Sequence, residues 1–264
     1  MRQQIPNVFT LANLFCGCCA VVLLLYGQPV AAAWFTLGSF FFDLGDGMMA
    51  RALNVASPIG RELDSLADVV SFGVVPGAML YGLLATIFCA AFPDFFPWAV
   101  TAKAAAPDME LGLLPVCRAA LPAFILSLFS AYRLAKFNLD TRQKDYFIGL
   151  STPGCTLFVL GLTLAAHDNQ WGVGSLMAGQ PWVLYALVVI FSFLLVSEIP
   201  MFGLKFRSFR WQENKMPYLF LALSITALLV LRGLGLSLVI LFYIGLSLVS
   251  KNKITGPPTP GITH

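Results

Sequence analysis

Two adjoining apolar stretches of the sequence carry four aspartates, an unusual place for charged groups. Asp43 and Asp46 lie at the end of one stretch, and Asp64 and Asp68 lie at the beginning of the next. An isolated ionised carboxylate inside a membrane costs several kcal/mol, so such groups face a polar cavity, pair with a cation or bind metal ions. Clustered carboxylate oxygens are hard ligands that suit Mg²⁺ or Mn²⁺ and match zinc poorly without His or Cys. The four aspartates therefore predict a site for divalent cations.

The spacing of these aspartates places each pair on one side of its own helix. The first two are three residues apart and the second two are four apart, which is close to one helical turn. Two antiparallel helices joined by a short turn can point both pairs at one spot, where a pair of cations would fit. The alternative is a set of salt bridges with Arg51 and Arg61, but the carboxylates outnumber these cations and would still repel one another.

Small residues separate the two acidic pairs. Gly47, Ala50 and Gly60 remove side-chain bulk where a nucleotide would lie against the helix backbone. Their alternative role is close packing of helices in lipid, where small residues three or four apart are common. Their position between the aspartates favours a bound ligand.

The composition indicates that these helices cross a membrane. Of the 264 residues, 58% are hydrophobic and only 11% are charged, which leaves too little polar surface to coat a water-soluble globule. The net charge of +3 is too small to argue for a nucleic-acid partner. The cysteines have neither paired CxxC spacing nor neighbouring histidines, so we expect small apolar side chains in lipid rather than metal ligands or disulfides. They are Cys16, Cys18, Cys19, Cys89, Cys117 and Cys155.

Apolar stretches near the length that crosses the bilayer, roughly 20 residues for about 30 Å of hydrocarbon, recur along the chain. They predict an all-α, polytopic membrane helix bundle with about eight spans in one domain, residues 1–255, followed by a disordered tail, residues 256–264. The last two spans can form a tight hairpin around Arg232 and Gly233. The expected spans are Val8–Tyr26, Val30–Leu53, Leu63–Phe88, Pro115–Ala135, Gly149–Ala166, Trp182–Phe202, Pro217–Leu231 and Leu234–Val249.

Basic residues are distributed unevenly between the two sets of connections. One set holds only Lys103, Arg118 and Arg232. Because positively charged loops stay cytoplasmic, we expect both termini and the acidic residues on the cytoplasmic side, which in a bacterium means the inner or plasma membrane. The other set contains Arg51, Arg61, Arg133, Lys136, Arg142, Lys144, Lys205, Arg207, Arg210, Lys215, Lys251 and Lys253.

The acidic segment resembles the signature of the CDP-alcohol phosphotransferase family at every fixed position. The matching pattern is Asp43-x-x-Asp46-Gly47-x-x-Ala50-Arg51, eight residues, then Gly60-x-x-x-Asp64-x-x-x-Asp68. The resemblance implies a six-helix core, four aspartates around two divalent metals, Mg²⁺ or Mn²⁺, and Asp68 as both ligand and general base. It also implies a CDP-binding surface formed by Asp46, Gly47, Ala50, Arg51 and Gly60.

Three further segments resemble the phosphatidylserine synthase branch of that family. They are Ile5–Leu14, Ser65–Pro76, and the pair Arg133–Asn138 and Gly149–Pro153. Two positions depart from the branch: Lys136 replaces an arginine and Ser151 replaces a proline. The resemblance implies CDP-diacylglycerol and L-serine as substrates.

Serine differs from other acceptor alcohols by its carboxylate and its ammonium, so its pocket should contain a cation. Arg133 and Lys136, three residues apart at the inner end of a helix, can supply that cation, with Asn138 nearby. The alternative is an ordinary positive anchor at lipid headgroups, which is favoured for Lys136 because lysine lacks the bidentate fork of arginine. Glu198, near the inner end of its own span, can pair with a basic residue there.

We therefore expect direct attack of the serine hydroxyl on the phosphate next to diacylglycerol. Glycerol 3-phosphate and inositol remain alternative acceptors, because the acidic signature is common to the whole family. An ion-coupled transporter is a more distant alternative, since it would carry its acids in two related halves. The sequence leaves open whether the bundle forms a homodimer.

Overall fold

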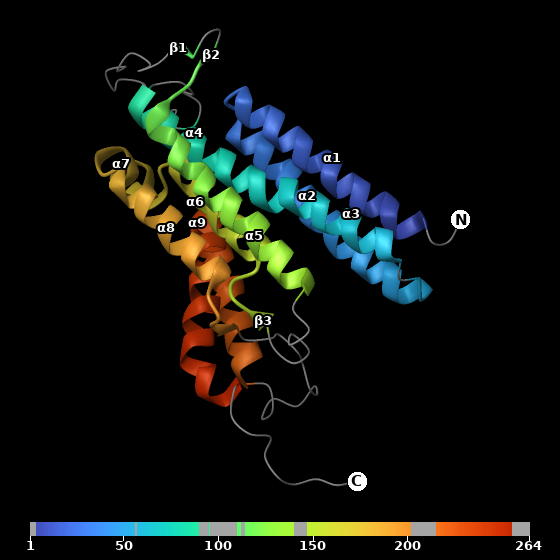
Figure 1. The fold of residues 1–264 in the computed structure, drawn as a ribbon. Coiled ribbons are helices and arrows are strands. Elements are labelled where there is room, and N and C mark those ends of the chain that lie inside the picture. The colour runs from blue at the N-terminus through green and yellow to red at the C-terminus, as the bar shows by residue number, and fades with distance from the viewer. Residues whose placement is uncertain are drawn as a thin grey trace.

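The computed structural model describes residues 4–55, 57–89, 95, 110–111, 114–139, 147–201 and 215–254, and these residues are almost entirely helical (Figure 1). The expectation of an all-α membrane bundle is confirmed. Among these described residues the strands are four two-residue segments in two pairs, β1 (Glu110–Leu111) with β2 (Leu114–Pro115) and β3 (Phe147–Ile148) with β4 (Pro200–Met201). The helices are α1 (Ile5–Leu25), α2 (Pro29–Leu53), α3 (Pro58–Asp68), the π-helix η2 (Val69–Val74), α4 (Val75–Cys89), the 3₁₀ helix η4 (Arg118–Phe124), α5 (Ile125–Leu139), α6 (Thr152–His167), η5 (Gln170–Gly172), α7 (Val173–Gly179), α8 (Trp182–Val196) and α9 (Lys215–Ile254).

Several of these helices are long and apolar enough to cross a membrane, which indicates an integral membrane protein. Four pass this test of length and composition, and a fifth span results if the bent pair Gln170–Gly179 and Trp182–Val196 is one crossing. The expected total of eight spans stays a prediction. The expected boundaries lie within a few residues of the helices, except that α8 ends at Val196, six residues before the predicted end at Phe202. The predicted tail, residues 256–264, lies outside the described residues.

The turn between α2 and α3 has the residues that end one helix and begin the next. Asn54 closes α2 in the left-handed conformation (φ 51°), which asparagine tolerates better than most residues. Ser57 then caps α3, because its side chain accepts a hydrogen bond from the backbone N–H of Gly60 at 3.0 Å. This short connection places the two acidic pairs at the same end of the bundle, called the acidic end below.

The helix that follows the second acidic pair changes from α to π geometry directly after Asp68. Hydroxyl groups from neighbouring helices bond the carbonyl groups of this segment. Ser127 of α5 donates to the Gly73 carbonyl at 2.8 Å, and Thr156 of α6 donates to the Phe72 carbonyl at 3.0 Å. A π segment is rare and occurs often at functional sites. Here these hydrogen bonds connect the π segment to α5 and α6.

The last helical segment, α9, is a hairpin, as the sequence predicts. Its backbone breaks at Arg232, where φ is 47°. The rings of Phe220 and Tyr243 lie 6.2 Å apart on either side of the break. The hairpin packs against α6, where Ser237 donates to the Phe158 carbonyl at 2.8 Å (Figure 1).

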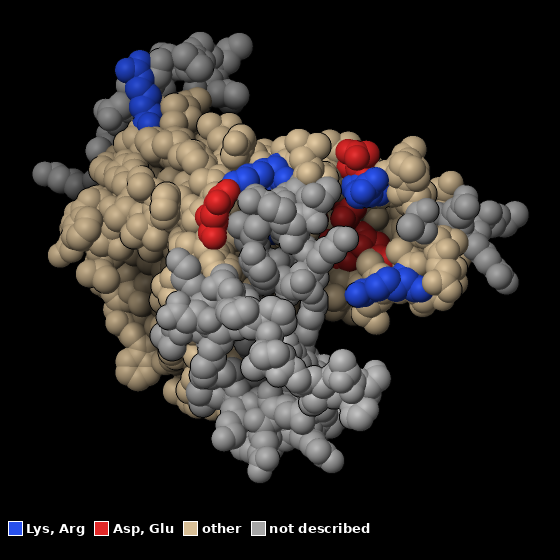
Figure 2. Space-filling view, turned by 60° about the horizontal axis from the view of Figure 1, so that its bottom comes forward, with Lys and Arg blue, Asp and Glu red and all other residues tan. Residues whose placement is uncertain are grey.

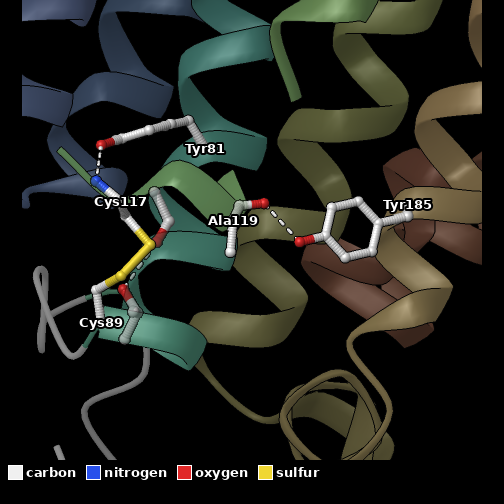
Figure 3. The surroundings of a disulfide bond; sticks show 7 residues. Tyr81, Cys89, Cys117, Ala119 and Tyr185 are labelled. Carbon is white, nitrogen blue, oxygen red and sulfur yellow. Dashed lines mark hydrogen bonds between the residues drawn. A yellow bond between two sulfur atoms is a disulfide. The ribbon is translucent and has the colours of Figure 1, made fainter. Parts of the chain in front are cut away.

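The sequence analysis is wrong about two of the cysteines. Cys89, at the end of α4, and Cys117, directly before η4, form a disulfide across 28 residues of sequence (Figure 3). Both side chains are buried. The other four cysteines are free, as expected. The disulfide joins two helix ends at the opposite end of the bundle from the aspartates, called the disulfide end below.

Candidate active site

Three of the four predicted carboxylates meet at one point. Asp43 comes from α2, and Asp64 and Asp68 come from α3. One oxygen from each of these side chains lies within 4.8 Å of the other two. Figure 2, which looks toward this end of the molecule, shows acidic side chains set in a hollow with basic side chains around it. The arrangement of two helices around a shared spot is the one that the sequence spacing predicts.

Asp46 lies beside this cluster with a different environment. Its side chain is buried, and it accepts a 2.7 Å hydrogen bond from the hydroxyl of Thr10 on α1. It is not part of the three-carboxylate group. The structure therefore places Asp46 between that group and α1.

Two observations show that the cluster suits a divalent cation. One oxygen of Asp64, Oδ1, is buried and has no hydrogen-bond partner, which is costly unless something else binds it. In addition, neither Arg51 nor Arg61 forms an ion pair with the aspartates in the described part of the chain. Arg51 instead donates to the Gly47 carbonyl of its own helix at 3.0 Å. The salt-bridge alternative therefore finds no support, and oxygen ligands of this kind fit Mg²⁺ or Mn²⁺.

A buried asparagine from α1 holds Asp68. The side chain of Asn13 is fully buried and donates to Asp68 Oδ1 at 3.3 Å. Ser39 of α2 donates in turn to the side-chain oxygen of Asn13, which leaves the amide nitrogen directed at Asp68. The backbone carbonyl of Asn13 also accepts from Ser39 at 3.1 Å and from Ser71 at 3.2 Å. Gly17, one turn further along α1, allows this approach because a Cβ there would collide with Ser71.

A pocket opens to solvent next to the aspartates. Its empty volume is about 610 Å³, including the part that is open to solvent. A Cβ added at Gly47 would meet no atom within 4 Å, so this glycine borders open space rather than a packed helix. A Cβ added at Gly60 would lie 2.9 Å from Ser57 Oγ and 3.1 Å from Asn7 Oδ1. Four of the five residues predicted to bind CDP line the pocket, and Arg51 does not. The lining is Pro6, Asn7, Thr10, Asp46, Gly47, Ala50, Val55, Ser57, Gly60, Arg61 and Asp64.

The three residues predicted to bind serine lie in three different environments. Arg133 is buried, stacks 5.0 Å from the centre of the Phe137 ring, and interacts electrostatically with Asp68 and Tyr243. Lys136 instead forms a 3.4 Å ion pair with Glu198, which is a basic partner of the kind expected for that glutamate. Asn138 donates at 2.8 Å to the hydroxyl of Ser65, on the helix that carries Asp64 and Asp68.

The sequence analysis missed the role of α1 in the site. Asn7, Thr10 and Asn13 all reach the pocket or the acids from this helix. They are three residues apart in an otherwise apolar segment, so they share one face. That spacing is a signal by which they could have been found.

Comparison with known protein families places this chain in one class. The model of the CDP-alcohol phosphatidyltransferase family matches residues 3–250. The chain therefore belongs to this family of enzymes, which confirms the resemblance seen in the sequence.

Individual relatives in this family share the name of one enzyme. The chain is 34% identical over 163 residues to a CDP-diacylglycerol–serine O-phosphatidyltransferase of Bacillus subtilis, covering 61% of this chain and 77% of that protein. It is 30% identical over 197 residues to the protein of the same name in Helicobacter pylori strain 26695, covering 74% and 70%. A protein of that name in Saccharomyces cerevisiae is 32% identical over 174 residues, covering 63% and 55%.

Proposed function

We propose that this enzyme transfers the phosphatidyl group of CDP-diacylglycerol to L-serine, giving phosphatidylserine and CMP. The observation that carries the proposal is the group of three carboxylate oxygens within 4.8 Å, beside a pocket bordered by Gly47. The names of the relatives favour serine over glycerol 3-phosphate and inositol.

Asp43, Asp64 and Asp68, with Asp46 beside them, would hold two divalent cations, Mg²⁺ or Mn²⁺. Bound there, the cations would supply positive charge against the pyrophosphate of CDP-diacylglycerol and the departing CMP. The CDP moiety would lie in the pocket, where Gly47 and Ala50 leave room for it. Asn7 and Thr10 add polar groups on the α1 side.

The reaction is a direct displacement at the phosphate next to diacylglycerol. The serine hydroxyl oxygen forms the new bond to phosphorus, and the bond from phosphorus to the CMP oxygen breaks. Asp68 takes the hydroxyl proton as general base. Asn13 fixes the orientation of the Asp68 carboxylate through its hydrogen bond to Oδ1.

Arg133 is the group best placed to bind the carboxylate of serine. Its side chain is 8% exposed and interacts electrostatically with Asp68. Within the described residues no carboxylate lies at ion-pair distance from Arg133. A buried cation without such a partner is costly, and the carboxylate of the acceptor would supply one. Lys136 is occupied by Glu198, which favours its role as an anchor.

The distribution of basic residues supports a cytoplasmic location for both termini and for the acidic end, in the inner or plasma membrane if the cell is bacterial. No feature of the described residues supports the homodimer that the sequence leaves open. Four of the basic residues assigned to the cytoplasmic side lie outside the residues whose side chains are described, namely Lys205, Arg207, Arg210 and Lys215.

The test uses purified protein, CDP-diacylglycerol, Mn²⁺ or Mg²⁺, and radiolabelled serine. We expect label to enter lipid with release of one CMP per serine, and a chelator to stop the reaction. Label that enters lipid only from inositol or glycerol 3-phosphate would assign a different acceptor. Asp68→Asn should lose turnover by a factor of about 10² or more, whereas Glu62→Gln, an exposed carboxylate on the same helix, should retain it. Full activity in Asp68→Asn would refute the role of the base.

A further inference from the structure

The Cys89–Cys117 disulfide lies one membrane thickness away from the acidic end. Asp68 and Cys89 belong to one continuous helical run, Pro58–Cys89. They are 21 residues apart, which at the 1.5 Å per residue of an α-helix is at most about 32 Å, since the π segment rises less per residue. The hydrocarbon core of a bilayer is about 30 Å thick. The acids and the disulfide therefore lie near opposite faces of the membrane.

Hydrogen bonds of two tyrosine hydroxyls, in addition to the disulfide, hold the segment that carries Cys117 in place. The hydroxyl of Tyr81 on α4 accepts a 3.3 Å hydrogen bond from the backbone N–H of Cys117. The hydroxyl of Tyr185 on α8 donates to the carbonyl of Ala119, two residues further along (Figure 3). Cys89 and Cys117 are 7% and 3% exposed. The fold thus keeps the two sulfur atoms together at one buried point.

The position of this cysteine pair in the membrane determines the compartment to which it is exposed. Disulfides form and persist outside the cytosol, whereas cytosolic thiols are kept reduced. The charge distribution assigns the same end of the bundle to the outside, since the outer connections hold only Lys103, Arg118 and Arg232. Charge and cysteine chemistry are independent observations, and they agree.

We infer that Cys89 and Cys117 are an extracytoplasmic oxidation site of this protein. The two thiols lose two protons and two electrons as the sulfur–sulfur bond forms. An oxidised thiol oxidoreductase accepts them: its own disulfide is attacked, a mixed disulfide forms, and the oxidoreductase leaves as a dithiol. The inference does not depend on the proposed reaction.

Counting thiols tests the oxidation. Cells that express the full chain are quenched in acid, the protein is denatured in maleimide without reductant, and its intact mass is measured. We expect adducts at four cysteines, the free set Cys16, Cys18, Cys19 and Cys155, and at six after reduction. Cys89→Ser should give five before reduction, because Cys117 loses its partner, and the control Cys155→Ser should give three. Six adducts in the unreduced wild-type protein would overturn the inference.

The compartment is tested in two further ways. In a host that lacks its extracytoplasmic thiol oxidase, the count before reduction should rise from four to six, and a count of four in both hosts would contradict oxidation outside the cytosol. Sidedness is measured with a membrane-impermeant maleimide on intact cells. The reagent should label Trp171→Cys, an exposed position next to α7 at the disulfide end, and should label Glu62→Cys only after lysis. The reverse pattern would refute the orientation.

Discussion

Replacing Asn13 with alanine should slow the reaction without impairing substrate binding or folding. The Asn13 amide donates to Asp68 Oδ1 at 3.3 Å, which is longer than the usual 2.9–3.0 Å for such bonds. Hydrogen bonds to charged groups contribute about 1.5–3 kcal/mol, so this long one belongs at the lower end. A loss of about 1.5 kcal/mol corresponds to a fall of roughly tenfold in kcat. The chain should still fold, because Ser39 keeps the backbone carbonyl of Asn13 as its acceptor.

The assay measures kcat and the KM values for CDP-diacylglycerol and serine, together with the melting temperature. A residue that orients the base should lower kcat and leave both KM values nearly unchanged. The matched control is Ser71→Ala. Among the described residues, Ser71 donates to the backbone carbonyl of Asn13 and to no other group, so its loss should leave kcat near the wild-type value. Our reasoning is refuted if Asn13→Ala retains full kcat, or if Ser71→Ala loses as much.

Three other changes give contrasting outcomes. Gly47→Leu should raise the KM for CDP-diacylglycerol at unchanged melting temperature, because the leucine side chain enters the open pocket. Gly60→Leu should instead lower the free energy of unfolding by about 1 kcal/mol or more, because it displaces the Ser57 cap. Activity assays and thermal melts distinguish the two effects. Arg133→Gln should raise the KM for serine by roughly tenfold or more, and the same substitution at Lys136, in an exposed ion pair, should change it little. Replacing both cysteines of the disulfide with serine removes a constraint on a 28-residue loop, worth at most about 3.6 kcal/mol, and should lower the melting temperature while kcat is retained.

The helices could be predicted because apolar length is a local property of the sequence. The end of α2 at Leu53 and the hairpin around Arg232 are those predicted, whereas α3 begins at Pro58, five residues before the predicted Leu63, because Ser57 caps it there. Contacts between distant segments could not be found in this way. The β3–β4 pair joins residues about 50 positions apart, and Gly149 there has φ +73° with no room for a Cβ against the Ser197 carbonyl.

The candidate site shows the same difference between local features and contacts of distant segments. The convergence of Asp43, Asp64 and Asp68 follows from helical spacing and one short turn, so the sequence is sufficient to predict it. The separate position of Asp46 depends on a hydroxyl 36 residues earlier, that of Thr10. The orientation of Asp68 depends likewise on Asn13, 55 residues away. The residues proposed to bind the metals and to act as the base were therefore predictable from local spacing, whereas the residues that contact them from α1 required the packing of that helix.

The disulfide shows why local spacing also misleads. Motif rules for cysteine depend on close spacing, and Cys89 and Cys117 are 28 residues apart in apolar surroundings. What brings them together is the packing of η4 against α4, together with the hydrogen bonds of the Tyr81 and Tyr185 hydroxyls. The same helical run that carries the acids at one end carries Cys89 at the other. Because one helix cannot have both ends in the cytosol when it spans the membrane, the chemistry of the sulfur atoms constrains the side on which the carboxylates meet their substrates.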